Sequence, residues 1–262
     1  MKKRVISAIV AALIVIPVCY LGGNYYRIGV GILAVLGFTE FLMAKDNIKE
    51  MPNMVKILSY LCLFMFIALQ VLNKNTFSID YRLLLFIILI YLIPIIFYQD
   101  DKKYNTDDAF YLIGGTLFLG LAFNILYYIR ESGLETLGYL VTITICSDTF
   151  AYFTGRLFGK HKMIPSISPN KTWEGAFGGT LVAVVLGTIF YYYFISKASI
   201  PLIIAKTLLL TIISQFGDLT FSAIKRHAKI KDFSNIMPGH GGILDRLDSL
   251  ILIMIAYMLI TL

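Results

Sequence analysis

Nine apolar segments run along the chain, each close to the length of about 20 residues that a helix needs to cross a bilayer. A bilayer core offers the backbone no hydrogen-bond partners, so segments of this length and number indicate helices rather than a single barrel. The sequence therefore predicts an all-α, polytopic membrane protein with about nine transmembrane helices. The expected helices cover approximately Val5–Gly22, Tyr25–Ala44, Met54–Leu72, Tyr81–Tyr98, Ala109–Ile129, Leu134–Thr154, Trp173–Ile195, Leu202–Ile224 and Gly242–Leu262.

Composition argues against an ordinary soluble domain. Hydrophobic residues make up 58% of the 262 residues and charged residues 15%, whereas soluble domains average about 45–50% and about 25%. The first segment follows Met-Lys-Lys-Arg, so a cleavable signal peptide is the alternative to a helix. The segment lacks an Ala-x-Ala cleavage pattern near Cys19, and this favours a retained helix.

The basic residues predict the orientation of the chain. With a cytoplasmic N-terminus, 16 of the 23 lysines and arginines fall at cytoplasmic helix ends and 6 on the opposite side, while Arg246 lies inside the last segment. This positive-inside bias predicts nine spans with the C-terminus outside. Topology then explains the net charge of +7, and we expect no nucleic-acid partner. The cysteines, Cys19, Cys62 and Cys146, have neither disulfide nor metal-site spacing.

Charged residues inside apolar segments are concentrated in the C-terminal half of the chain. An acid within a membrane span is costly and is treated first as a functional residue; the alternative is an acid near the interface that only pairs with a neighbour. We expect residues 1–132 to form about five helices whose role the residues leave open. Residues 133–262 should form the functional region, with cytoplasmic loops 155–172 and 225–241. The acids concerned are Asp148, Glu174, Asp218, Asp245 and Asp248.

One stripe of polar side chains is expected on the helix within Ser214–Asp232. Asp218, Ser222 and Lys225 follow at i, i+4 and i+7, which places them on one helical face, and Arg226 lies close to that face. A carboxylate, a hydroxyl and a cation would then line a path out of the membrane. The alternative is an ordinary basic helix end with one buried contact between Asp218 and Lys225.

The stretch Ser168–Gly175, SPNKTWEG, predicts a turn followed by the start of a helix. Asn170 or Thr172 would begin the helix, and Glu174 would occupy its first turn, where an acid is favoured. Lys171 is placed to meet an anion at the same helix N-terminus. A capped helix anchored at the interface is the alternative interpretation.

The stretch Pro238–Ser249, PGHGGILDRLDS, combines a glycine-rich loop with two acids. Backbone N–H groups exposed in such a loop attract phosphate. Asp245 and Asp248 follow at i, i+3, and oxygen ligands at a helix start beside bound phosphates suit Mg²⁺. We expect a divalent metal and a polyphosphate at the cytoplasmic face, with Asp218 and Asp245 facing each other and an amphipathic co-substrate entering from the bilayer.

The stretch Ser222–Asp248, SAIKRHAKIKDFSNIMPGHGGILDRLD, closely resembles the signature of the phosphatidate cytidylyltransferase (CDP-diacylglycerol synthase) family. Met237 is a conservative departure, where the family pattern has Leu, Ile or Phe. SDTFAYFTGRLFGKHKM and SPNKTWEGAFGG upstream are also similar to that family. The resemblance covers about Ser147–Leu262 strongly, and the N-terminal half only as a series of apolar spans.

The resemblance implies that CTP and phosphatidic acid react to CDP-diacylglycerol and pyrophosphate. It also implies a Mg²⁺ dependence with a second cation such as K⁺, a homodimer, and a multi-pass location in the cell membrane. Carried over residue by residue, Asp218 and Asp245 are metal ligands, and Lys225 joins them as a catalytic residue. The substrate-binding residues are Ser222, Lys225, Arg226, His240, Gly241, Gly242 and Lys171, and the second-rank residues are Asp148, Glu174 and Asp248.

Two other functions are compatible with parts of this pattern. A CTP-dependent lipid kinase would transfer the γ-phosphate and release CDP instead of pyrophosphate. A cation- or proton-coupled transporter would use Asp148, Asp218 and Asp245 as a relay. Transporters, however, often carry interrupted helices in both halves, whereas the polar features of this chain lie in one half.

Overall fold

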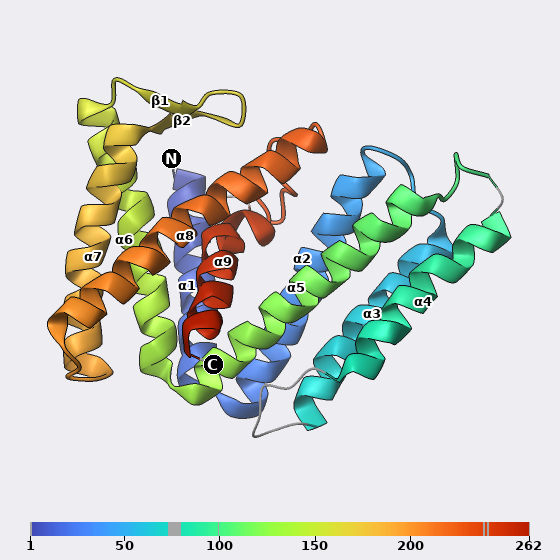
Figure 1. Cartoon of the computed structure of the whole chain (residues 1–262), viewed down its shortest axis with the longest axis horizontal. Coiled ribbons are helices and arrows are strands. Elements are labelled where there is room, and N and C mark those ends of the chain that lie inside the picture. The colour runs from blue at the N-terminus through green and yellow to red at the C-terminus, as the bar shows by residue number, and fades with distance from the viewer. Residues whose placement is uncertain (1, 73–79, 99, 238, 240, 262) are drawn as a thin grey trace. The chain divides into compact units, whose positions relative to one another are not determined.

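The computed structural model describes residues 2–72, 80–98, 100–237, 239 and 241–261. This part of the chain contains nine α-helices and one two-stranded sheet (Figure 1), and every helix matches an expected segment to within four residues at each end. The all-α prediction is therefore confirmed apart from the small sheet. The helices are α1 (Lys2–Leu21), α2 (Gly23–Asp46), α3 (Asn53–Leu72), α4 (Tyr81–Tyr98), α5 (Thr106–Ser132), α6 (Leu134–Phe158), α7 (Trp173–Phe194), α8 (Ile200–His227) and α9 (Leu244–Thr261).

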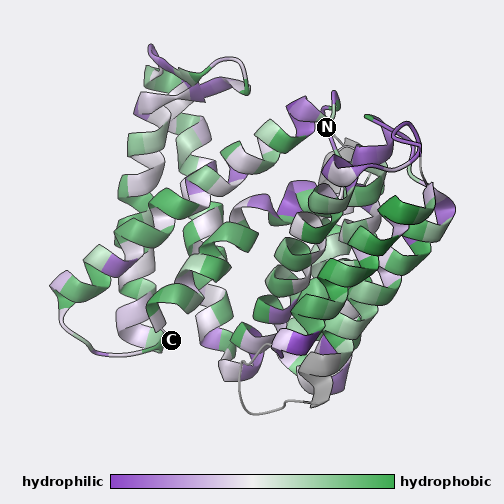
Figure 2. Ribbon diagram, turned by 45° about the vertical axis from the view of Figure 1, so that its right-hand side comes forward, coloured by the Kyte–Doolittle hydropathy of each residue, from purple (hydrophilic) through white to green (hydrophobic). Residues whose placement is uncertain are grey.

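Among the described helices, five are long and apolar enough to cross a membrane: α2, α4, α5, α7 and α8. Figure 2 shows hydrophobic residues along most of the helical length, with hydrophilic residues gathered at loops and helix ends. Such a distribution is typical of an integral membrane protein. The total of about nine spans stays a prediction.

A β-hairpin interrupts the helices where the sequence predicts only a polar loop. Its strands are β1 (Lys162–Ile164) and β2 (Ser168–Thr172), which pair antiparallel with Lys162 opposite Thr172 and Ile164 opposite Ser168. Strands of three and five residues are too short to show a hydrophobic alternation. Only the folded chain, which brings the two strands together, reveals them.

The chain divides into two compact units. Unit 1 comprises Met1–Tyr128 and Ala228–Ile243, and unit 2 comprises Ile129–His227 and Leu244–Leu262. The segment Ala228–Ile243 therefore belongs to unit 1, although it joins two helices of unit 2. The functional division expected after residue 132 stays a prediction.

In unit 1, helices α2, α3 and α5 pack closely where α5 carries glycine. A Cβ added at Gly115 would overlap the ring of Phe41 on α2, and one at Gly120 would meet the ring of Phe66 on α3. Asn124, one turn further, donates hydrogen bonds to the carbonyl oxygens of Phe66 and Gly120. Small residues and polar side chains of this kind are the usual means of joining helices in a bilayer.

In unit 2, α6 lies along α7 and α8 lies along α9 (Figure 1). Glycines permit both approaches, because a Cβ at Gly179 of α7 would lie 2.5 Å from the carbonyl oxygen of Ser147 on α6. A Cβ at Gly217 of α8 would lie 2.9 Å from the carbonyl oxygen of Asp248 on α9. Gly217 precedes Asp218, so this contact brings two of the acids singled out in the sequence onto neighbouring turns.

Candidate functional site

The end of α8 and the start of α9 are joined by a nearly buried ion pair in unit 2. Lys225 Nζ lies 2.6 Å from Asp245 Oδ1, and the two side chains are 11% and 4% exposed. Lys225 occupies the last turn of α8 and Asp245 the first turn of α9. A helix's last turn favours a cation and its first turn an anion, so the two helix dipoles support this pair.

Asp218 is paired through both of its carboxylate oxygens. Lys171 Nζ, from the end of β2, lies 2.7 Å from Asp218 Oδ2, and Ser222 Oγ donates to Asp218 Oδ1 over 3.3 Å. Ser222 is one turn beyond Asp218 on α8, as the i, i+4 spacing predicts. The expected polar stripe on α8 is thus present, but the partner of Asp218 is Lys171, and the partner of Lys225 is Asp245.

Two further acids complete the group. Asp148 of α6 is close enough to interact electrostatically with Asp218, Lys171 and Arg246. Asp248 of α9 interacts in the same way with Asp218, Lys225 and Asp148. Four elements of unit 2 therefore converge on one mixed group, which we call the acid–lysine cluster: Asp148, Lys171, Asp218, Lys225, Asp245 and Asp248.

Arg246 and Arg226 differ in what they contact. Arg246 interacts electrostatically with Asp148, so it balances charge within unit 2. Arg226 Nε donates to the carbonyl oxygen of Ile167 over 3.3 Å, and Ile167 lies in the turn between β1 and β2. Arg226 thereby ties the end of α8 to the hairpin that carries Lys171.

Glu174 lies at the base of the hairpin and contacts His161. Its carboxylate accepts from the backbone nitrogen of His161 at 3.2 Å, and His161 Nδ1 lies 2.6 Å from Glu174 Oε1. Thr172 caps α7, because its Oγ1 accepts from the backbone nitrogen of Gly175 at 3.2 Å. Thr172, rather than Asn170, is thus the residue that begins this helix.

Gly241 and Gly242 belong to unit 1, and the third member of that predicted phosphate loop, His240, lies outside the described residues. Gly239 and Gly241 have φ values of 80° and 84°, a left-handed conformation that favours glycine. The backbone of Met237 pairs with that of Gly241 in both directions, at 3.0 and 3.1 Å. The expected glycine turn is therefore present.

Sequence reasoning missed the role of Gln215. Its Nε2 donates to Ser147 Oγ on α6 and to Ala176 O and Thr180 Oγ1 on α7, at 3.0 to 3.1 Å. One amide thus joins three helices one turn before Asp218. A polar residue inside the apolar run of α8 is the signal that could have drawn attention to it.

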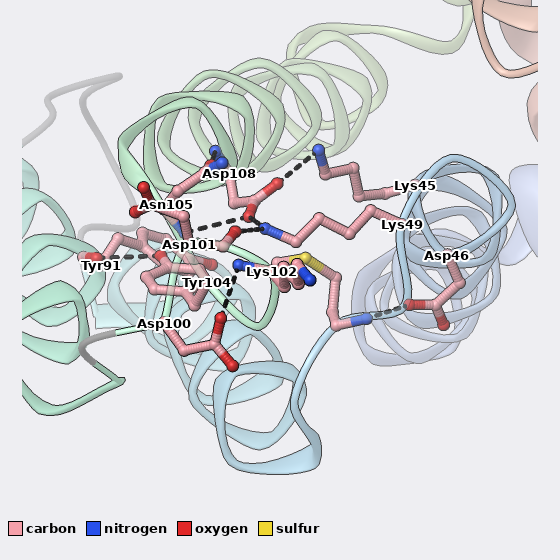
Figure 3. A network of polar contacts seen from close by, with 11 residues as sticks. Lys45, Asp46, Lys49, Tyr91, Asp100, Asp101, Lys102, Tyr104, Asn105 and Asp108 are labelled. Atoms are coloured by element: carbon pink, nitrogen blue, oxygen red, sulfur yellow. Dashed lines mark hydrogen bonds and ion pairs between the residues drawn. The ribbon is translucent and has the colours of Figure 1, made fainter.

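A second buried polar network, in unit 1, was also missed (Figure 3). The carboxylate of Asp108, on α5, pairs with Lys45 of α2 and with Lys49, three residues beyond the end of α2, and it accepts from the backbone nitrogen of Asn105. Tyr104 donates to the carbonyl oxygen of Tyr91 on α4, and burial raises the pKa of Tyr104 well above its usual value. These polar groups form hydrogen bonds and ion pairs with one another, so we interpret the network as one that joins helices and not as a ligand-binding site.

No group of three or more His, Cys, Asp or Glu side chains could hold a metal ion within the part of the chain that the structure describes. Within the acid–lysine cluster, Asp218 is paired with Lys171 and Asp245 with Lys225.

Comparison with known proteins places the chain in a family. The sequence model of the Cytidylyltransferase family matches residues 2–262, and the chain belongs to this family. It is 33% identical over 257 residues to the phosphatidate cytidylyltransferase of Staphylococcus haemolyticus, covering 97% of this chain and 96% of that protein. The proteins of the same name from Staphylococcus epidermidis and Staphylococcus aureus are 33% and 32% identical over the same coverage. The resemblance seen in the C-terminal half thus extends over the full length.

Proposed function

We propose that this chain is a nucleotidyltransferase of phospholipid biosynthesis, a phosphatidate cytidylyltransferase. It transfers the cytidylyl group of CTP to phosphatidic acid, which gives CDP-diacylglycerol and pyrophosphate. The full-length family match supports the activity. The observation that carries the proposal in the structure is the acid–lysine cluster, which offers carboxylates for a metal and cations for phosphates within one unit.

The reaction joins two anions. A phosphate oxygen of phosphatidic acid attacks the α-phosphorus of CTP and forms a new P–O bond. The bond from the α-phosphorus to the oxygen that bridges to the β-phosphorus breaks, and pyrophosphate leaves with the electron pair. The attacking oxygen is already charged, so no strong base is required. The protein must instead position the substrates and offset their repulsion, as in other phosphoryl chemistry.

Mg²⁺ is the proposed cofactor, because one or two carboxylates together with substrate phosphates commonly hold this ion, and K⁺ is the candidate for the second cation. Asp218 and Asp245 supply the hard oxygen ligands that Mg²⁺ prefers. When bound, Mg²⁺ would withdraw electron density from the phosphate oxygens and stabilise the leaving pyrophosphate. Lys171 and Lys225 balance these acids in the structure, and the same ammonium groups are placed to neutralise substrate phosphates.

The remaining roles follow from position. Arg226 holds the hairpin at the end of α8, so it serves substrate binding both by charge and by placing Lys171. Ser222 orients Asp218. The stretch His240, Gly241 and Gly242 is proposed to bind phosphate through its backbone N–H groups. Three further acids are proposed to surround the metal and substrate ligands without binding the metal directly: Asp148, Glu174 and Asp248.

The protein is proposed to be a multi-pass protein of the cell membrane whose active site faces the cytoplasm. Five long apolar helices and the positive-inside bias support this location. Phosphatidic acid would then reach the site from the surrounding bilayer. Residues 133–262 are proposed to carry catalysis. Residues 1–132 are proposed to serve packing or homodimer formation.

The test uses the purified full-length chain in detergent or nanodiscs with CTP, phosphatidic acid and Mg²⁺. The expected products are pyrophosphate and a CDP-lipid in equal amounts, with label transferred from the α-phosphate of CTP and ATP failing as the donor. Transfer of label from the γ-phosphate would identify a lipid kinase and contradict the proposal. Cation flux into liposomes without CTP, together with no lipid product, would favour the transporter.

A further inference from the structure

Glu40 is a fully buried acid of α2 that the reaction described above does not use. Its Oε1 accepts a hydrogen bond from Ser234 Oγ at 2.6 Å and from the backbone nitrogen of Ile243 at 2.8 Å. Both partners lie about two hundred residues further along the chain, within the same unit 1. Burying a carboxylate is costly unless hydrogen bonds satisfy it, so these contacts indicate a specific task.

The two partners stand on opposite legs of the segment Ala228–Ile243. The legs are paired through the backbone contacts between Met237 and Gly241, with Ser234 before the turn and Ile243 after it. The backbone nitrogen of Ile236 also donates to Ser234 Oγ at 3.3 Å. One carboxylate oxygen therefore fastens both the entry and the exit of the turn.

Gly242 gives independent support for this arrangement. A Cβ added at Gly242 would lie 2.3 Å from Glu40 Oε1, with the rest of the carboxylate within 2.6 Å. The φ of Gly242 is not in the left-handed region, so close approach to Glu40, and not backbone conformation, requires a glycine at this position.

We propose that Glu40 is a positioning residue for cytidylyl transfer. It holds the turn within the segment Ala228–Ile243, which begins three residues after Lys225 and ends two residues before Asp245. Glu40 thereby keeps in one conformation the stretch of chain that connects the ion-paired residues of α8 and α9. The inference rests on the proposed function. Catalytic groups need their supporting contacts to hold them within a fraction of an ångström, because small displacements cost much of the rate.

The first test is Glu40→Gln, which keeps the shape of the side chain and removes its charge. Hydrogen bonds to a neutral acceptor are weaker than those to a carboxylate, so kcat should fall by about tenfold. The thermal midpoint and the KM for CTP should change little. Backbone amide exchange at Ile236 and Ile243 should become faster, while exchange in the middle of α2 stays as in the wild type. The matched control is Asp46→Asn. Asp46 lies on the same helix as Glu40, and the substitution loses an ion pair with Lys56 of α3; this variant should keep wild-type kcat.

The second test is a rescue. Gly242→Ala should lower kcat about as much as Glu40→Gln, because the added Cβ displaces the carboxylate. Combining it with Glu40→Asp withdraws the carboxylate by one methylene, so the double variant should be more active than Gly242→Ala alone. The control for replacing a glycine with alanine is Gly31→Ala on α2, because a Cβ added at Gly31 meets nothing within 4 Å.

Three results would overturn the inference: wild-type kcat in Glu40→Gln, a loss of activity that only follows a lowered thermal midpoint, or strictly additive effects of Gly242→Ala and Glu40→Asp. A wild-type chain that makes no CDP-lipid would instead refute the proposed function. Amide exchange at Ile243 in Glu40→Gln would still report whether Glu40 holds the segment.

Discussion

Asp245→Asn is the substitution that separates the structural from the chemical role of the acid–lysine cluster. Asp245 is almost completely buried and pairs with Lys225 at 2.6 Å. The asparagine keeps the size of the side chain and one oxygen acceptor. It removes the negative charge that balances Lys225 and that a metal ion would require.

The size of the stability effect follows from the burial of the pair. Removing one partner of a buried ion pair costs about 3–5 kcal/mol, because the other charge is left uncompensated. The remaining amide oxygen of the asparagine can still accept from Lys225, so we expect about 3 kcal/mol. A loss of roughly 2–4 °C for each kcal/mol then lowers the thermal midpoint by about 6–12 °C, and the protein stays folded at assay temperature.

A double-mutant cycle with Lys225→Gln resolves the two roles. Removing both charges should cost clearly less stability than the sum of the single changes, with a coupling of up to about 3 kcal/mol. Pyrophosphate release, measured together with thermal unfolding in detergent, should be abolished in Asp245→Asn and should not return in the double variant. Near-normal pyrophosphate release by Asp245→Asn would refute the assignment of Asp245 as a metal ligand. Recovery of activity in the double variant would show that the pair serves only the fold.

Three further predictions concern other contacts. Asp108→Asn should lower stability by about 3 kcal/mol in thermal unfolding, because it leaves two lysines uncompensated around a buried position, while the folded fraction keeps its specific activity. Gly179→Ala should cost about 1–3 kcal/mol because its Cβ would meet a backbone oxygen of α6; Gly31→Ala, in open space, should be neutral or stabilising by up to about 1 kcal/mol. Lys171→Ala loses a partly exposed ion pair with Asp218, so the free energy of unfolding should change by less than about 1 kcal/mol. The kcat/KM for CTP should fall more than tenfold, and an unchanged kcat/KM would contradict the proposed role of Lys171.

The helices were predictable because each corresponds to a continuous run of apolar residues. The backbone groups of a helix also hydrogen-bond within the helix itself, so no distant partner is needed. The element ends were less predictable. Helix α6 continues to Phe158, four residues beyond the expected end. Thr154 and Gly155 in this extension contact Gly175 at the start of α7, and the local sequence does not reveal such a tertiary contact. The hairpin that follows depends on pairing between Lys162 and Thr172, which no local pattern records.

The contacts of the candidate site residues were predictable only in part. The i, i+4, i+7 spacing placed Asp218, Ser222 and Lys225 on one face of α8, and the contact of Ser222 with Asp218 agrees with it. The spacing could not say which acid Lys225 meets, because Asp245 lies on another helix. The metal and substrate roles of these residues stay predictions.

The sequence by itself determined the helical class, the approximate bounds of nine helices and the residues of the family signature, since hydrophobic runs and short motifs are written in consecutive positions. Only the tertiary structure decided that Lys171 meets Asp218, that Gln215 joins three helices, and that Glu40 fastens a turn some two hundred residues away. The physical reason is that a buried charge needs a partner at hydrogen-bonding distance. Glycines such as Gly217 and Gly242 set which backbones approach closely enough to provide one.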